Sequence, residues 1–282
     1  MGMSLFFALS GFLITSALRH NSDVHAFLVR RLARIVPLAY LYVLVLLAFR
    51  QIDTDAALWT MGFAVNYAHP YLGEWNGHFW SLCVEVQFYA AIALVVLLVG
   101  PRGLLLVWPA CFAITALRVG EGAHHSIVTH LRVDEILAGA CVATLIGSPF
   151  WKSTRVTLAL TGMTVALWFL SSHPASGAIM YLRPYCSAAF LAAVAVTDCS
   201  SVHRALSARV PRYIATISYA LYVLHGVTLH GWMNTGGTLE RYVFKRPISL
   251  AATFALAHLS TFYWERFWQQ WGRQWRAKSA IM

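Results

Sequence analysis

Polar and titratable side chains crowd a short segment that runs directly into an apolar stretch of the chain. The segment contains His78, Ser81, Glu85, Gln87 and Tyr89, and the apolar residues 90–99 follow it. A charged carboxylate within a bilayer costs several kcal/mol unless it faces a partner or a watery cavity. The pattern therefore fits a polar pocket that opens to one face of a membrane. It fits equally well a structural hydrogen-bond acceptor at Glu85, with His78 and Trp80 as interfacial anchors.

Three arginines lie close together at the entrance of another apolar segment, namely Arg30, Arg31 and Arg34. Residues three apart lie on one side of a helix, so Arg31 and Arg34 can form a fork that grips a phosphate group through paired hydrogen bonds. Basic residues also anchor membrane spans at the cytoplasmic face without any ligand. Both interpretations fit the sequence.

Charged residues also stand at the ends of two further apolar segments. Arg132 precedes Asp134 at the start of one, where an acid suits the helix dipole and an arginine can neutralise a buried acid. Structural pairing is the favoured interpretation there. Glu265 and Arg266 close the last apolar segment, where a snorkelling interfacial anchor is the simplest explanation.

A histidine lies deep within the apolar segment 213–231. Ser218, Tyr222 and His225 are spaced by four and three residues, so their side chains share one helix face, with Tyr219 beside them in the chain. An ionisable group inside a membrane is a functional candidate by default. A hydrogen bond between tyrosine and histidine on different helices accounts for this histidine nearly as well.

The composition is that of a polytopic membrane protein. Hydrophobic residues make up 59% of the 282 residues, charged residues make up 11%, and the mean hydropathy is +0.61. Soluble domains are about 45–50% apolar and about 25% charged. The net charge of +10 is attributed to basic residues on cytoplasmic loops, so no nucleic-acid partner is expected. No long linker interrupts the sequence, which predicts a single membrane domain.

Metal and disulfide sites are not expected. The five cysteines are scattered singly with no Cys-x-x-Cys pair. The loop histidines His124, His125 and His130 match no common zinc spacing. Four glycines are expected to permit close helix approach or kinks rather than phosphate binding: Gly11, Gly62, Gly139 and Gly162.

Nine apolar stretches are long enough to cross, or nearly cross, a hydrocarbon core of about 30 Å. They lie at about residues 4–18, 35–49, 80–99, 103–118, 134–147, 155–171, 178–197, 213–231 and 247–268. The segment 56–70 contains Asn66, His69 and Pro70 and is predicted to be an interfacial or re-entrant helix. The expected fold is therefore an all-α transmembrane helical bundle.

Basic residues favour one orientation of this bundle. Lysine and arginine are most abundant on alternate loops if the first predicted span ends inside the cell. This arrangement predicts a multi-pass protein of the inner (plasma) membrane with a cytoplasmic C-terminus. It also places residue 1 on the outer face, an awkward start for a chain with no translocated leader, so a further helix is expected upstream.

Taken together, these motifs resemble the acyltransferase-3 family of integral-membrane O-acyltransferases. Residues 4–15 are similar to the family's second-helix signature, and residues 27–37 are similar to its basic segment with Arg-x-x-Arg. Residues 78–89 resemble its His-x-Trp-Ser-Leu-x-x-Glu-x-Gln-Phe-Tyr block, which is the most specific match. The resemblance covers nearly the whole chain, because further groups follow in the expected order: 132–134, 218–225 and 265–266.

The resemblance implies transfer of an acyl group, usually acetyl, from cytoplasmic acyl-CoA to a hydroxyl of a glycan, glycolipid or similar acceptor. Arg31 and Arg34, with Arg30 beside them, would then bind the phosphates of the donor. That use fits the cytoplasmic side predicted for these arginines. Acyl-CoA is a co-substrate in this reaction, so no bound cofactor is expected.

The resemblance also assigns a pocket to residues 78–89. Glu85, with His78 and Ser81 near it in sequence, would line the place where the acceptor hydroxyl meets the thioester. A hydroxyl that attacks a thioester must lose its proton while the developing oxyanion is stabilised. Histidine suits the first task, and Arg, Tyr or Ser donors suit the second.

One departure from the family pattern concerns the proton acceptor. Members usually begin with another helix that carries an arginine, ten intervening residues and a histidine taken to be catalytic, whereas this sequence begins just before the second-helix signature. The resemblance therefore implies a truncated or misassigned start. His78 and His225 are the candidates to replace the absent histidine, and little acyl transfer is expected from the 282 residues alone.

Two alternatives stay open at the level of sequence. Glu85, Asp134 and His225 could line the path of a transporter or flippase, although no inverted repeat of the kind common in transporters is evident. The chain could also be a catalytically inactive family relative that serves as an interaction partner.

Overall fold

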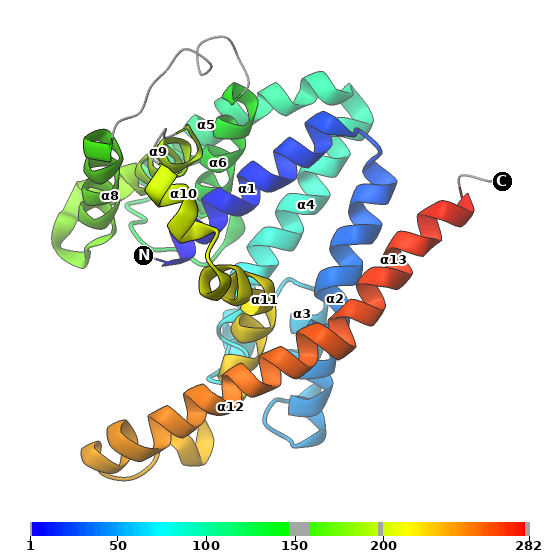
Figure 1. Ribbon diagram of the computed structural model, residues 1–282, viewed down its shortest axis with the longest axis vertical. Coiled ribbons are helices and arrows are strands. Elements are labelled where there is room, and N and C mark those ends of the chain that lie inside the picture. Colours follow the sequence, from blue (N-terminus) through cyan, green and yellow to red (C-terminus); the bar gives the residue numbers. More distant parts are fainter. Residues whose placement is uncertain (1, 147–157, 197–199, 280–282) are drawn as a thin grey trace. The chain divides into compact units, whose positions relative to one another are not determined.

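The computed structural model describes residues 2–146, 158–196 and 200–279 (Figure 1). Within these ranges every regular element is a helix and no strand occurs, which confirms the predicted all-α class. The chain divides into two compact units. The first unit comprises residues 1–24 and 81–204, and the second comprises residues 25–80 and 205–282.

The first unit is arranged around a short buried helix, α6. Its elements are α1 (Gly2–His20), α4 (Phe79–Val99, whose first two residues belong to the second unit), η2 (Pro101–Leu106), α5 (Val107–Gly120), η3 (Thr129–Leu131), α6 (Asp134–Leu145), α8 (Leu158–Ser172), η4 (Pro174–Leu182), α9 (Arg183–Val196) and α10 (Ser200–Leu206). Helix α6 packs against α1, α5 and α9, as Figure 1 shows. All of its residues from Asp134 to Ala143 are buried.

Backbone atoms of α1 and α6 meet directly where the two helices cross. A Cβ atom added to Gly11 would lie 1.8 Å from the carbonyl oxygen of Ile136, and one added to Gly139 would lie 1.8 Å from that of Ala8. Small residues permit such close packing between helices in membranes. The expected close approach is therefore confirmed for Gly11 and Gly139, whereas a Cβ atom at Gly162 would meet no atom within 4 Å.

The second unit combines α2 with the C-terminal helices. Its elements are α2 (Val24–Ala48), α3 (Thr54–Met61), η1 (His69–Tyr71), α11 (Arg209–Leu229), η5 (Gly231–Asn234), η6 (Glu240–Lys245), α12 (Arg246–Leu259), η7 (Ser260–Glu265) and α13 (Arg266–Ser279). Helix α12 packs on α11 and is flanked by the π-helical turns η6 and η7. Helix α13 contacts α2, because a Cβ atom at Gly272 would lie 2.9 Å from the Cβ atom of Ala33.

Buried hydrogen bonds shape the segment between α3 and α4. The Asn76 side-chain amide donates to Thr60 Oγ1 at 3.0 Å and to the Tyr71 carbonyl at 2.9 Å, and its oxygen accepts from the Gly73 N–H at 2.7 Å. These bonds fix the chain just before His78. The segment 56–70, predicted to be interfacial or re-entrant, contains most of the eight-residue helix α3 followed by turns.

Five helical segments in the described ranges are long and apolar enough to cross a membrane, which supports a multi-pass membrane protein. They are Gly2–His20, Val24–Ala48, Phe79–Val99, Pro101–Gly120 and Pro174–Val196. The arrangement with nine spans therefore stays a prediction. One boundary differs clearly from expectation, because α2 begins at Val24 and carries the three arginines within the helix rather than before a span at 35–49.

The α1–α6 crossing yields a stability prediction. Replacing Gly139 by alanine forces a methyl group against the Ala8 carbonyl, and overpacking of this kind costs about 1–3 kcal/mol or more. We expect a lower midpoint of thermal unfolding in detergent. The matched control is Gly162→Ala, which meets no neighbour and gains helix propensity. Equal midpoints for the Gly139 variant and the wild type would show that the helices are not in backbone contact.

Candidate functional site

Glu85 is a buried hydrogen-bond acceptor in the first unit. The residue lies on α4 and is 6% exposed. Ser10 Oγ donates to Glu85 Oε1 at 2.7 Å, and the Tyr89 hydroxyl donates to the same oxygen at 2.5 Å. Donors of this kind stabilise a carboxylate. Tyr89 reaches Glu85 because the two residues are one helical turn apart, and Ser10 is a partner that the sequence did not reveal.

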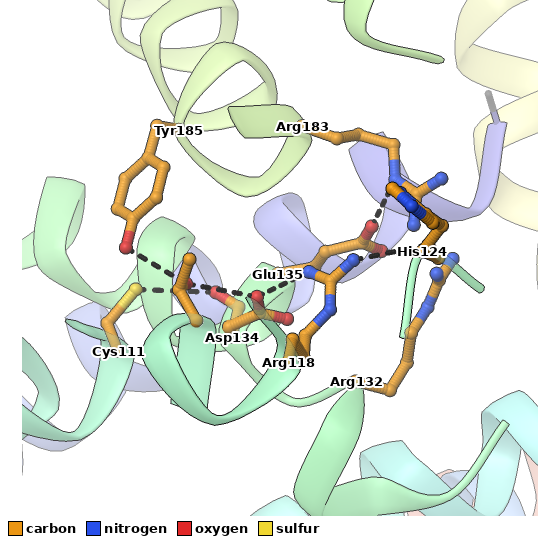
Figure 2. A network of polar contacts seen from close by, with 9 residues as sticks. Cys111, Arg118, His124, Arg132, Asp134, Glu135, Arg183 and Tyr185 are labelled. Carbon is orange, nitrogen blue, oxygen red and sulfur yellow. Dashed lines mark hydrogen bonds and ion pairs between the residues drawn. The ribbon is translucent and has the colours of Figure 1, made fainter. Parts of the chain in front are cut away.

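A buried network of ions lies at the start of α6 (Figure 2). Arg118 Nη1 lies 2.5 Å from Asp134 Oδ2, and both side chains are fully buried. Thr115 Oγ1 donates to the same carboxylate oxygen at 3.1 Å. The Tyr185 hydroxyl in turn donates to Thr115 Oγ1 at 2.9 Å. Asp134 thus joins α5 to α6, and through Thr115 it is linked to α9.

The second carboxylate of this network is shared by two arginines. Glu135 Oε1 lies 2.6 Å from Arg183 Nε, and Glu135 Oε2 lies 3.3 Å from Arg132 Nη2. All three side chains are nearly inaccessible. We call the five residues Arg118, Arg132, Asp134, Glu135 and Arg183 the arginine network.

The arginine network differs from the predicted pairing in its partners. Asp134 forms its ion pair with Arg118, and Arg132 forms its ion pair with Glu135. Sequence reasoning did not identify Arg118, Glu135 or Arg183 as site residues. Each is an ionisable residue beside or within an apolar stretch, which is the signal that could have found them.

Gln87 connects α4 to the loop before this network. Thr129 Oγ1 donates to Gln87 Oε1 at 2.5 Å, and Thr129 opens the short helix η3 that precedes Arg132. Ser81 is also buried in the first unit. Gln87 therefore links α4 to η3, and its predicted place in a pocket stays a prediction.

Two imidazoles lie together in the second unit. The ring centroids of His78 and His225 are 4.6 Å apart, and the Tyr222 hydroxyl donates to the His78 carbonyl oxygen. His78 Nε2 lies 3.1 Å from the carbonyl oxygen of Val223. We call His78, Tyr222 and His225 the histidine cluster. A carbonyl can only accept, so we assign the Nε2 proton to this bond and a lone pair to Nδ1.

The surroundings of His78 keep its ring neutral. Burial, aided by the nearby His225 and His230, lowers the pKa of His78 from 6.5 to about 3, while the Val223 carbonyl opposes the shift. The residue stands just before α4. At neutral pH the ring therefore carries no charge, and its Nδ1 lone pair is free of a proton.

Not every predicted member joins the histidine cluster. Ser218 is exposed and donates to the Ala215 carbonyl within its own helix at 2.9 Å. The Tyr219 hydroxyl donates to the Ile35 carbonyl at 2.5 Å and so ties α11 to α2. Trp80 is half-buried at the start of α4.

The three arginines of α2 differ in exposure. Arg30 and Arg31 are half-buried, whereas Arg34 is exposed. The Arg31 guanidinium lies 5.8 Å from the centre of the Phe27 ring. Arg34 interacts electrostatically with Glu265, which also accepts a hydrogen bond from Thr261 Oγ1 at 3.0 Å. Glu265 is therefore buried and interacts with Arg34 of α2. A snorkelling anchor, as predicted, would instead extend its charged group to the interface.

Comparisons with known proteins agree with this arrangement of motifs. A family model described as an acyltransferase domain (Acyl_transf_3) matches residues 1–264. The O-acetyltransferases OatA of Staphylococcus aureus strains NCTC 8325 / PS 47 and COL are 26% identical over 305 aligned residues, which cover 90% of this chain and 50% of each relative. The chain thus spans about half the length of these curated relatives. No solved structure matches the chain significantly.

The Arg118–Asp134 pair yields a second stability prediction. Arg118→Gln leaves a buried carboxylate without its guanidinium, and breaking one partner of such a pair costs about 3–5 kcal/mol. We expect this loss in the free energy of unfolding measured in detergent. Glu74→Gln is the control, because its pair with His230 is exposed and such pairs contribute about 0–1 kcal/mol. Similar losses in both variants would contradict the burial of the Arg118 pair.

Proposed function

Because this chain belongs to the family of acyltransferase domains, we propose that it is a membrane-embedded O-acyltransferase. It transfers an acyl group, most simply acetyl, from acyl-CoA to a hydroxyl of a glycan, glycolipid or similar acceptor. The observation that carries this proposal is His78, a half-buried and neutral imidazole held in one orientation by the Val223 carbonyl. O-acyl transfer needs such a proton acceptor beside a hydroxyl group.

The geometry of His78 supports a role as general base. Its Nδ1 atom lies on the side of Gly226, where a Cβ atom would come within 3.3 Å of it. The low pKa disfavours a charged ring in the resting protein. An anion beside the ring favours its protonated form, so the oxyanion that develops on the thioester carbonyl oxygen helps the ring take the proton as the hydroxyl attacks the carbonyl carbon. The C–S bond then breaks, CoA leaves as its thiolate, and the thiolate takes up the proton held by the ring. His225 and Tyr222 are proposed to hold the ring in place.

The arginines of α2 are proposed to bind the donor. Acyl-CoA carries several phosphate groups, and guanidinium groups bind phosphate through paired, charge-assisted hydrogen bonds. Arg34 is exposed, and Arg30 and Arg31 retain partial exposure, so their charges are accessible to a soluble anion. This assignment places α2's first turns on the cytoplasmic side of the inner membrane, together with the C-terminus. The co-substrate arrives and leaves, and no resident cofactor is proposed.

A role as transporter or flippase has less support from the described residues. Asp134 is paired with Arg118, and Glu135 is shared by two arginines. Carboxylates that are already neutralised by buried arginines are poor proton carriers, because proton uptake would leave the arginine charges uncompensated. An inactive relative would keep the same pairing. A measurement of acyl transfer separates it from an active enzyme.

His78 is the residue for the first test of activity. In membranes that contain the protein, we expect His78→Ala to reduce transfer of labelled acetyl from acetyl-CoA to surface glycans by about 10²–10⁴-fold, the usual contribution of a general base. His20→Ala is the control, because this side chain is exposed and is bonded to the Ser16 carbonyl of its own helix. Full activity of the His78 variant would remove the proposed base. Absence of transfer by the wild type, with no ester-linked acetyl lost from the glycans of a deletion strain, would favour an inactive relative.

The donor site is tested separately with the arginines of α2. We expect Arg31→Gln and Arg34→Gln to weaken acetyl-CoA binding by about 10–100-fold each, because one charge-assisted hydrogen bond contributes about 1.5–3 kcal/mol. Acetyl-pantetheine, which lacks the nucleotide phosphates, should bind the variants and the wild type equally. Arg204→Gln removes an exposed arginine of the first unit and should change neither affinity. Unchanged acetyl-CoA affinity in both α2 variants would refute the assignment.

A further inference from the structure

The arginine network holds more positive than negative charge in a nearly dry environment. Three arginines face two carboxylates, and Arg132 and Arg183 share the single carboxylate of Glu135. Arg118 is fully buried, Arg183 is 3% exposed and Arg132 is 7% exposed. Buried charges are costly unless they are matched. One positive charge in this network therefore has no counterpart among its own residues.

The network also has hydrogen-bonding capacity that the described residues do not use. Arg118 Nε, Arg183 Nη2 and His124 Nδ1 are buried and have no hydrogen-bond partner in the described ranges, and neither does Asp134 Oδ1. Figure 2 shows His124 beside the Arg183 guanidinium, on the Glu135 side of the network. Unused donors suit an oxyanion, and an unused carboxylate oxygen suits a hydroxyl group. A sugar that carries an acidic group offers both.

The loop between α5 and α6 lies in direct contact with the arginine network. Arg118 Nη2 donates to the His124 carbonyl at 3.3 Å, so the network reaches directly into this loop. The neighbouring His125 is exposed. Partial desolvation lowers the pKa of His125, and the charges of Arg183, Arg132 and Arg118 lower it further. The positive field of the buried arginines is therefore felt at an exposed position.

We propose that the arginine network binds the acidic group of a sugar, a carboxylate or a phosphate, through Arg183 and Arg132, with His124 beside them. Arg118 and Asp134 form the neutral inner pair that supports the site. The binding itself is independent of the proposed acyl transfer. Only the further identification of this acidic sugar as the acceptor rests on the proposed function.

A purely structural role is the competing explanation, since buried Arg–Glu–Arg triads occur in proteins without any ligand and the loss of one partner alone is destabilising. The two explanations differ in what Glu135 does. In a structural triad Glu135 is needed to neutralise the arginines, and no ligand binds. In an anion site Glu135 competes with the ligand for the same guanidinium groups, so its removal strengthens binding.

The test measures the binding of glucuronate, glucose 6-phosphate and glucose to the purified protein in detergent by isothermal titration calorimetry. We expect one or both charged sugars to bind at least tenfold more tightly than glucose, and the stronger of the two identifies the acidic group. Arg132→Gln should weaken that binding about tenfold or more, while Arg132→Lys should restore part of it. Glu135→Gln should strengthen it. Arg102→Gln, at an exposed arginine of the same unit, should have no effect.

Several outcomes would overturn the proposal. Binding of glucose as tight as that of both charged sugars, or no binding of any of the three, would leave the arginine network with a structural role. Equal loss in the Arg102 and Arg132 variants would indicate a general surface effect. Unfolding midpoints measured without ligand identify any variant that fails to fold, and Arg132→Lys then supplies the comparison. Because no acyl donor is present, these outcomes are independent of whether acyl transfer occurs.

Discussion

The direct contact between the backbones of α1 and α6 is the constraint on which the first unit depends. Gly11 and Gly139 leave no side chain between the helices, so each helix meets a carbonyl group of the other. This contact brings α1 deep into the unit, where Ser10 reaches Glu85. It also fixes the first turn of α6, from which Asp134 and Glu135 project to their arginines. The hydrogen bond to Glu85 and the ion pairs of the arginine network thus depend on the close helix crossing that two glycines permit.

The two units place their ionisable groups in different kinds of environment. In the first unit, opposite charges neutralise one another with little access to water. In the second unit, aromatic rings and a backbone carbonyl surround an imidazole that is kept neutral by burial. Matched buried charges hold one another in the ionised form, whereas a neutral imidazole has no fixed counter-charge that opposes a change of its protonation state. The second environment is therefore the better one for proton transfer.

Much of the fold was predictable from sequence, because an apolar composition with few charges requires helices that satisfy their own backbone hydrogen bonds in lipid. Polar residues within apolar stretches marked Glu85, His78 and His225 for the same reason. The partners could not be read in this way. Arg118 pairs with a residue 16 positions away and Arg183 with one 48 positions away, so only the packing of α5 and α9 on α6 reveals them. Ser218 shares the predicted face of α11, but it is exposed and donates to the Ala215 carbonyl of its own helix instead of joining the histidine cluster.

The group that orients His78 is a backbone carbonyl and not a side chain. The acceptor at Val223 is a peptide oxygen, and every amino acid at this position would supply the same oxygen. Surveys that replace residues one at a time will therefore register Val223 as an ordinary apolar site and overlook its contribution. The backbone of α11 sets the orientation of the imidazole. A distortion of that helix will therefore disturb the orientation more than any single substitution at Val223.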